Sequence, residues 1–245
     1  MRNLLLKLRF DGKNYHGWQI QKNSLSVQEV FQKSLKEIIK CNCDIKACSR
    51  TDAGVHAKEF CVNVFLNHRI SPQGLMMALN RILPSDMAVF DCFEVPINFH
   101  ARYSCVGKEY TYKILNSRVK DPFWDGYALH YWHRIDIEDL QRAASFFVGT
   151  HDFTSFCTLD SRQKGDFRRT IKKFLVTKDK FIITMMVEAD GFLYNMVRIM
   201  VGTLLGVSRG ALKPHEIKDI LNAKDRKLAG PTVKSCGLYL NKVFY

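Results

Sequence analysis

The chain has 245 residues, of which 47% are hydrophobic and 25% charged, and this balance excludes an intrinsically disordered chain. Its net charge of +13, from 37 lysines and arginines against 24 aspartates and glutamates, favours a polyanionic partner, either nucleic acid or an anionic membrane surface. No apolar run reaches the roughly 18 residues of a membrane-spanning helix. Because Lys7 and Arg9 interrupt the apolar start, we expect no signal peptide and a cytoplasmic protein.

The eight cysteines are scattered along the chain, and none of them belongs to a C-x-x-C pair. A structural zinc site therefore lacks its usual ligand spacing. In a chain without an export signal, reduced and buried thiols are the better interpretation. We expect no metal.

The first hundred residues alternate strand and helix signals. Alternating apolar residues over 4–10 predict a half-buried strand. Ser26 and Glu29 have the spacing of a capping box, and Ser71 followed by Pro72 is a favourable helix start. The expected elements are a strand at 4–10, a helix from 26 to 39, strands at 45–48 and 60–65, a helix at 71–82 and a strand at 87–95.

The rest of the chain contains elements of the same kinds. Tyr110, Tyr112 and Ile114 share one face of a predicted strand. Asp136 is a suitable N-cap for a helix that runs through Phe147 and that Gly149 would end. The further elements are strands at 170–176 and 181–187, an apolar helix at 194–207, a short helix at 214–221 and a last strand at 238–244.

The order of these elements predicts an α+β fold. In the first half the order strand, helix, strand, strand, helix, strand is that of a split βαβ unit. We predict two halves, residues 1–104 and 105–245, with a boundary near 101–107 and no low-complexity linker. Their sheets could stay separate or join into one platform with a cleft along the seam.

The most informative stretch is Arg-Thr-Asp-Ala-Gly-Val-His-Ala at 50–57. An Asp-x-Gly sequence alone is typical of a turn, because Asp bonds its own backbone and Gly supplies a positive φ. Here an arginine and a histidine flank it between two apolar segments, where a carboxylate is either paired or reactive. Asp52 could be a turn residue, a nucleophile or a general base. A metal site would need more ligands, and His56 is the one nearby candidate.

Arg198 stands in an apolar segment, 194–205, that predicts a buried helix. A buried arginine keeps its charge, so we expect a carboxylate from elsewhere in the fold beside it. A structural salt bridge, or a side chain that extends to the surface, would explain Arg198 equally well.

Two further features suit RNA binding, although each also has a simpler explanation. Tyr110 could stack on an unpaired base, whereas periodicity alone favours a core position. A basic run could contact phosphates or form an ordinary solvated face. The run comprises Arg162, Lys164, Arg168, Arg169, Lys172, Lys173, Lys178 and Lys180.

Together these residues resemble the TruA family of tRNA pseudouridine synthases over almost the whole chain. The family's signature Arg-Thr-Asp-x-Gly-Val-His-Ala is present at 50–57, and its N-terminal signature, Phe-Asp-Gly with Tyr-x-Gly-Trp-Gln, at 10–19. One departure from the family pattern is Ser49, where the family often has Gly. A serine changes the local turn little and could mark a subgroup with altered substrate choice. Further matches follow in order at 99–102 with 108–112, at 149–153, at 196–198, and at 229–232 with 237–240.

The resemblance implies an isomerase that converts uridine to pseudouridine in the anticodon stem-loop of tRNA. Asp52 resembles the family's catalytic nucleophile or base, and Arg198 the buried partner of that aspartate. Tyr110 resembles the residue that stacks on the target base and assists proton transfer, so the resemblance implies Asp52, Tyr110 and Arg198 as the catalytic residues. Arg50 resembles the side chain that fills the space left by the flipped base. The resemblance also implies two ferredoxin-like halves around a central catalytic cleft, a homodimer with one tRNA spanning both subunits, and no cofactor or metal.

Other functions remain open on the sequence alone. A non-catalytic RNA-binding protein on the same scaffold predicts damage to Asp52, Tyr110 or Arg198, and all three are present. A hydrolase using Asp52 would need a second acid or a histidine to activate water, and His56 is the nearby candidate. A synthase with another RNA target is also compatible. For the isomerase, Asp52 could attack C1′, add to C6 or remove the 2′ proton.

Overall fold

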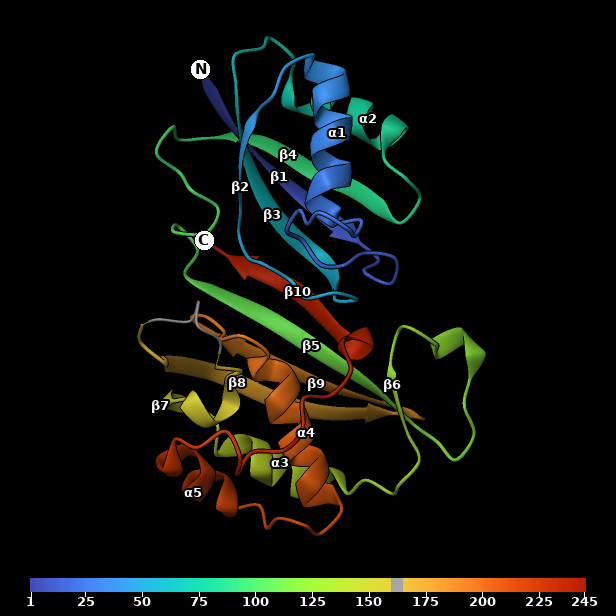
Figure 1. Cartoon of the computed structure of the whole chain (residues 1–245), viewed down its shortest axis with the longest axis vertical. Coiled ribbons are helices and arrows are strands. Elements are labelled where there is room, and N and C mark those ends of the chain that lie inside the picture. The colour runs from blue at the N-terminus through green and yellow to red at the C-terminus, as the bar shows by residue number, and fades with distance from the viewer. Residues whose placement is uncertain (160–164) are drawn as a thin grey trace. The chain divides into compact units, whose positions relative to one another are not determined.

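The structure is a computed structural model that describes residues 1–159 and 165–245. The chain forms two compact units, Met1–Val106 with Tyr239–Tyr245, and Gly107–Leu238 (Figure 1). The first unit therefore includes most of the final strand, which sequence order alone assigns to the C-terminal half. Helices and strands are mixed in both units, which confirms the α+β class.

The first unit is one sheet with helices packed over it. Strand β1 is antiparallel to β3 and β4, and β2 is antiparallel to β3. β10 runs parallel to β3, with Tyr239 opposite His56 and Leu240 opposite Ala57. Helices α1 and α2 pack against each other over one face of this sheet (Figure 1). The elements are β1 (Arg2–Phe10), α1 (Val27–Ile39), β2 (Asp44–Ala47), β3 (His56–Leu66), α2 (Pro72–Ile82), β4 (Met87–Val95) and β10 (Leu238–Phe244).

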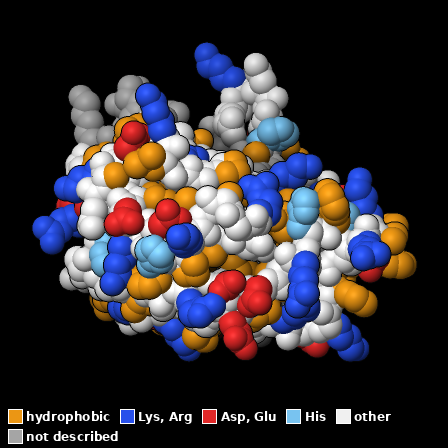
Figure 2. All heavy atoms as spheres, turned by 90° about the horizontal axis from the view of Figure 1, so that it is seen from below, with side chains coloured by type: hydrophobic (Ala, Val, Ile, Leu, Met, Phe, Trp, Pro, Cys, Tyr) orange, Lys and Arg blue, Asp and Glu red, His pale blue; other side chains and the backbone are white. Residues whose placement is uncertain are grey.

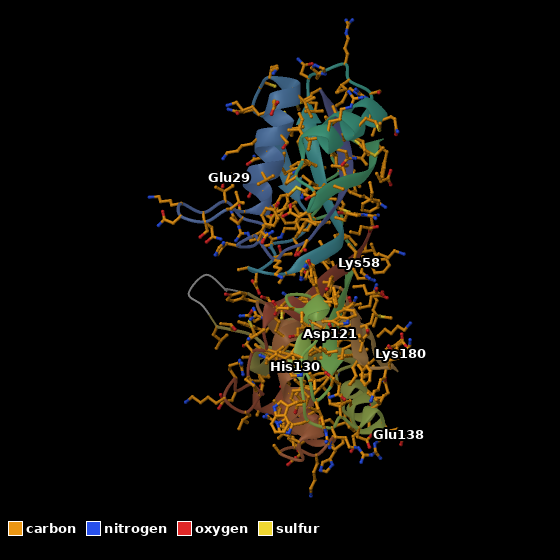
Figure 3. The ribbon with its side chains drawn as sticks, turned by 90° about the vertical axis from the view of Figure 1, so that its right-hand side faces the viewer. Glu29, Lys58, Asp121, His130, Glu138 and Lys180 are labelled. Carbon is orange, nitrogen blue, oxygen red and sulfur yellow. The ribbon has the colours of Figure 1, made fainter. Side chains whose placement is uncertain are left out.

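The helix starts of the first unit follow the sequence signals. The Ser26 hydroxyl accepts a hydrogen bond from the Glu29 amide at 3.3 Å, which is the capping interaction that the spacing predicts. Glu29 projects from the first turn of α1 (Figure 3) and pairs with Lys33 at 2.6 Å. The Ser71 hydroxyl likewise accepts from the Gly74 amide at 3.0 Å.

In the second unit, neighbouring strands follow the order β5-β9-β8-β7 and are antiparallel. The short strand β6 runs parallel to β5. Helix α4 packs against α3 and β5, and the turn between β8 and β9 carries Lys180 at a φ of 51° (Figure 3). The elements are β5 (Gly107–Asn116), β6 (Leu129–Tyr131), α3 (Ile137–Ser145), β7 (Gly149–Asp152), β8 (Arg168–Asp179), β9 (Ile182–Ala189), α4 (Met196–Ser208) and α5 (Glu216–Ala223).

Some boundaries differ from those that the sequence predicts. β3 begins at His56 instead of near Phe60, because Ala57 pairs with β1 as well as β10. α3 ends at Ser145, and Gly149, with φ of 111°, opens strand β7 instead of ending the helix directly. β6 and β7 were not predicted, since such short strands carry too little alternation to be recognised. None of the helices in the described parts of the chain has the length and apolar character that crossing a membrane requires.

Candidate active site

The loop between β2 and β3 carries Asp52 and is held by backbone hydrogen bonds. The Thr51 carbonyl accepts from the Trp18 amide at 3.2 Å, and the Gly54 amide donates to the Tyr15 carbonyl at 3.0 Å. Within the loop the Val55 amide donates to the Asp52 carbonyl at 3.2 Å. The segment at 15–18 therefore fixes the loop on both sides of Asp52.

Two glycines of the N-terminal signature let residues 10–19 and the Asp52 loop approach each other closely. A Cβ on Gly12 would lie 2.0 Å from the Val55 carbonyl oxygen, and a Cβ on Gly17 would lie 2.3 Å from that of Thr51. Gly17 also has a φ of +82°, which favours glycine. The signature at 10–19 is thus the surface on which the Asp52 loop rests.

His56 adds a side-chain tether at the end of the loop. Its ring is buried, stacks on Tyr239 with centroids 4.6 Å apart, and places Nδ1 3.0 Å from an oxygen of Asp11 and 3.1 Å from the Gly12 amide nitrogen. A protonated Nδ1 donates to Asp11, and an unprotonated one accepts from Gly12. Either form joins the start of β3 to the turn after β1, so the geometry favours a structural role over water activation.

The segment that supports the loop is itself anchored. The Tyr15 hydroxyl donates to Asp86 at 2.6 Å, and burial together with this carboxylate raises the pKa of Tyr15. Trp18 is buried and stacks on Phe60 of β3, with ring centroids 4.4 Å apart. The Asp52 loop therefore rests on residues that are fixed to the sheet.

The side chains of the loop differ in exposure. Arg50 is exposed and Asp52 is half-buried, so both are accessible from solvent. Thr51 is buried, and its hydroxyl has no hydrogen-bond partner among residues 1–159 and 165–245. The Ser49 hydroxyl donates to the Arg50 carbonyl at 3.3 Å, which is compatible with a turn that tolerates serine here.

The tyrosines of β5 occupy core positions. Tyr110 is 7% exposed and makes an edge-to-face contact with Phe192, with ring centroids 5.0 Å apart. Tyr112 is fully buried and donates its hydroxyl hydrogen to the Lys234 carbonyl at 2.6 Å. Burial raises the pKa of Tyr112. Both rings are thus held in the core, which is the position that the alternation of residues along the strand predicts.

Arg198 lies in the first turn of α4, after the buried Met196 and Val197. Its side chain is half-buried, whereas the apolar sequence around it predicts a buried position. Its Nε donates to the Val233 carbonyl at 2.8 Å. Its Nη1 donates to the side-chain oxygen of Asn195 at 2.8 Å. The guanidinium is therefore fixed by two neighbours within the second unit.

The stretch at 229–233 lies directly on α4. A Cβ on Gly202 would be 1.9 Å from the Pro231 carbonyl oxygen, and the Gly230 amide donates to the Thr203 hydroxyl at 2.8 Å. The C-terminal family motif at 229–232 thus holds the helix that carries Arg198, and the next residue, Val233, supplies the carbonyl that binds Arg198.

The described part of the basic run is a mostly exposed strand. Arg162 and Lys164 lie outside the described residues. Lys172 and Lys173 are both exposed because a bulge shifts the register of β8 at this point. Lys172 lies 3.7 Å from Glu188, an ordinary surface pair. Figure 2 shows Lys and Arg side chains dispersed among acidic and hydrophobic ones on the face seen from below.

The sequence identifies some of these residues and misses others. Arg50, Asp52 and His56 lie on one segment of the first unit, and the strand of Tyr110 packs against the helix of Arg198 in the second. Asn195 and the Val233 carbonyl had no signal in the sequence beyond adjacency to family motifs. In the described residues, no group of three or more His, Cys, Asp or Glu side chains is arranged to hold a metal ion.

Comparison with known proteins agrees with these motifs. Residues 8–104 and 143–245 match the tRNA pseudouridine synthase family model. The chain is 43% identical to tRNA pseudouridine synthase A of Thermoanaerobacter sp. (strain X514), over all of both chains. It is 42% identical to the enzymes of that name from Clostridium acetobutylicum and Acetivibrio thermocellus, again over 100% of each chain. The chain belongs to the tRNA pseudouridine synthase family, and the resemblance inferred from the sequence is confirmed.

Proposed function

We propose that this protein is an isomerase that converts uridine to pseudouridine at neighbouring positions of the anticodon stem-loop of tRNA. Family membership and full-length relatives named tRNA pseudouridine synthase A support the proposal. The observation that carries it is the loop of Asp52, which the same unit anchors on both sides of the carboxylate. A carboxylate that must meet a reacting atom in fixed geometry needs such support.

The proposed reaction is an isomerisation, so its atoms balance without a co-reactant. The N1–C1′ bond breaks, the uracil turns, and a C5–C1′ bond forms; C5 then loses its proton and N1 gains one. The base must first leave the helical stack. Asp52 can begin the reaction by attack at C1′, by addition at C6 or by removal of the 2′ proton, and each route uses an ionised carboxylate.

We assign roles by the family resemblance. Asp52 is the catalytic carboxylate, and Arg198 is the cation that favours its charged form, since an opposite charge nearby stabilises a carboxylate. Tyr110 is assigned the stacking contact with the target base and a part in proton transfer. Arg50, exposed on the loop of Asp52, fills the space that the flipped base leaves.

We further propose that tRNA binds largely through its phosphates. The net charge of +13 supports this, because phosphate contacts provide most of the affinity for nucleic acid. The exposed Lys172 and Lys173 of β8 are candidate contacts. The proposal includes a homodimer with one tRNA spanning both subunits, acting in the cytoplasm. Recognition rests more on RNA shape than on base edges.

The decisive experiment is site-resolved pseudouridine mapping on an unmodified tRNA transcript incubated with the wild type, with Asp52→Ala and with Asp44→Asn. We expect modification of anticodon-arm uridines by the wild type and by Asp44→Asn, whose exposed carboxylate belongs to strand β2. Asp52→Ala should form no pseudouridine and should keep its tRNA affinity.

Other outcomes separate the alternatives. Full activity of Asp52→Ala would refute its catalytic role. Tight tRNA binding by a wild type that makes no pseudouridine would indicate an RNA-binding protein, and release of uracil would indicate a hydrolase. Modification of other RNAs alone would keep the isomerase and overturn the tRNA substrate. Sedimentation of the protein with and without tRNA tests the dimer.

A further inference from the structure

Asn195, immediately before α4, has an unusual backbone and an unusual side-chain partner. Its φ of 60° and ψ of 7° place it in the left-handed region, which asparagine tolerates better than most residues. An asparagine at a helix start ordinarily accepts a hydrogen bond from an amide of the first turn. Within the described chain the Asn195 side chain makes no such capping bond. Helix capping therefore does not account for this residue.

The Asn195 side chain instead links Arg198 to Thr158. Its Oδ1 accepts from Arg198 Nη1 at 2.8 Å, and its Nδ2 donates to the Thr158 hydroxyl at 2.9 Å. The Thr158 amide also donates to the Tyr194 carbonyl at 3.1 Å, so the two segments are joined by backbone as well. Because Thr158 accepts from the amide nitrogen, it turns the amide oxygen towards the arginine.

The guanidinium is held from its other side by backbone. Arg198 Nε donates to the Val233 carbonyl at 2.8 Å. The next carbonyl, that of Lys234, accepts from the buried Tyr112 hydroxyl, which anchors this stretch to β5. A guanidinium is planar, so bonds to two of its nitrogens from two residues define both its position and the direction of its plane.

We propose that Asn195 and Thr158 are positioning residues that fix the Arg198 guanidinium for uridine isomerisation. Thr158 orients the Asn195 amide, and Asn195 orients Arg198. Asn195 makes its bond to Arg198 from a left-handed backbone conformation. Strained conformations of this kind persist where the surrounding structure requires a particular geometry. The inference rests on the proposed function, in which Arg198 acts with the catalytic carboxylate.

The test uses variants that remove either the Asn195 side chain, with both of its hydrogen bonds, or the Thr158 hydroxyl alone. Asn195→Gly accepts the φ of 60° without strain, so the protein should fold and melt much as the wild type does. Its kcat should fall about 10- to 100-fold, because a misplaced reacting group costs up to roughly two orders of magnitude, while KM for tRNA stays unchanged. Thr158→Val should lower kcat less, and Thr158→Ser, which keeps the hydroxyl, should restore it.

The double variant Asn195→Gly with Thr158→Val gives an independent readout. If Thr158 acts through Asn195, the double variant should have the kcat of Asn195→Gly alone, since the two changes interrupt one chain of contacts. If the two losses of kcat were additive instead, Thr158 would not act through Asn195. A Thr158→Ser as impaired as Thr158→Val would show that the hydroxyl is not the relevant group.

Arg198→Ala separates failure of the inference from failure of the proposed function. An inactive Arg198→Ala beside an Asn195→Gly of wild-type kcat would overturn the positioning role and leave the function intact. A fully active Arg198→Ala would remove Arg198 from the mechanism and overturn both assignments. A drop in melting temperature for Asn195→Gly with unchanged kcat would reduce Asn195 to a structural residue.

Discussion

Asp52 and Arg198 lie on parts of the molecule that are held in different ways. The loop of Asp52 is fixed mainly by backbone groups, which bond to the segment at 15–18. Gly12 and Gly17 let the two segments of the chain approach closely. Arg198 is fixed by the side chain of Asn195 and by the carbonyl of Val233. The position of Asp52, the proposed catalytic carboxylate, thus depends on backbone contacts, and that of Arg198 depends on a polar side chain as well as on a backbone carbonyl.

This difference determines which substitutions each part tolerates. Where two backbones are in contact, an added methyl group displaces the chain, whatever its chemistry. Where a side chain orients another, a substitution of equal shape that removes one hydrogen bond is enough to change the geometry. The loop should therefore be most sensitive to the loss of glycine, and Arg198 to isosteric polar changes.

Gly17→Ala should have the largest effect on the loop. Its Cβ would lie 2.3 Å from the Thr51 carbonyl oxygen, at a φ of +82°. The left-handed backbone costs about 1–2 kcal/mol for alanine and the overpacking about 1–3 kcal/mol, so the free energy of unfolding should fall by about 2–5 kcal/mol. Urea unfolding measures this loss, and pseudouridine formation should decrease because Asp52 moves with Thr51.

Gly210→Ala is the matched control for that substitution. Gly210 has a similar φ of +72°, but an added Cβ would meet nothing within 4 Å. It should therefore cost only the backbone term of about 1–2 kcal/mol and leave activity unchanged. Equal losses in the two variants would show that the close approach to Thr51 contributes nothing.

His56→Gln should have the next largest effect, since it removes the side-chain tether of a loop otherwise held by backbone. The buried ring contacts Asp11, the Gly12 amide and the ring of Tyr239. We expect a loss of about 1–3 kcal/mol in unfolding free energy and a smaller fall in kcat than for Gly17→Ala. A kcat as low as that of Gly17→Ala would mean that the tether, and not the backbone, positions Asp52.

Local signals in the sequence predict much of this fold. Ser26 and Ser71 cap α1 and α2 as their spacing indicates, and the strand at 87–95 has the predicted ends. These features depend on residues close together in the chain. The family motifs likewise locate Asp52 and Arg198, because a motif match needs no knowledge of contacts.

What the sequence does not predict depends on contacts between distant segments. Parallel pairing of β10 with β3 joins residues 239–240 to 56–57, and nothing local reveals it. Gly17 resembles an ordinary turn glycine until the Thr51 carbonyl is seen against it. Asn195 resembles an ordinary helix cap, since its left-handed backbone is not encoded in any short pattern. The contacts of such residues are visible only in the folded structure.

Tyr112→Phe should have a smaller effect and sharpen the description of the Arg198 side. The buried hydroxyl donates to the Lys234 carbonyl, one residue beyond the carbonyl that binds Arg198. Its loss should lower the free energy of unfolding by about 0.5–1.5 kcal/mol and change kcat little, because Val233 keeps its own bond to the arginine. Thermal unfolding and kcat on tRNA measure both. If the kcat of Tyr112→Phe were as low as that of Asn195→Gly, the backbone at 233–234 would be what orients Arg198.

Asp152→Asn should have the smallest effect, since Asp152 lies neither in the Asp52 loop nor among the residues that hold Arg198. Both oxygens of Asp152 are engaged, one with the amide and hydroxyl of Thr154 and the other with Lys224 at 3.0 Å. Burial raises the pKa of this carboxyl, but the hydrogen bonds from Thr154 and Lys224 outweigh burial, and the pKa lies below its usual value. A lowered pKa in the folded state stabilises the fold above the unfolded pKa of about 3.9, and this contribution is lost as the pH falls through the folded value.

The difference between wild type and Asp152→Asn should therefore depend on pH. At pH 7 we expect the variant to be less stable by about 0.2–1 kcal/mol, since Lys224 is largely exposed and water screens the pair. Thermal unfolding followed from pH 7 downwards should show the two proteins converging below about pH 4, where the wild-type carboxyl takes up its proton. A gap that stays constant to low pH would show that the introduced amide disturbs packing, because only the charge of the aspartate can give a difference that disappears on protonation.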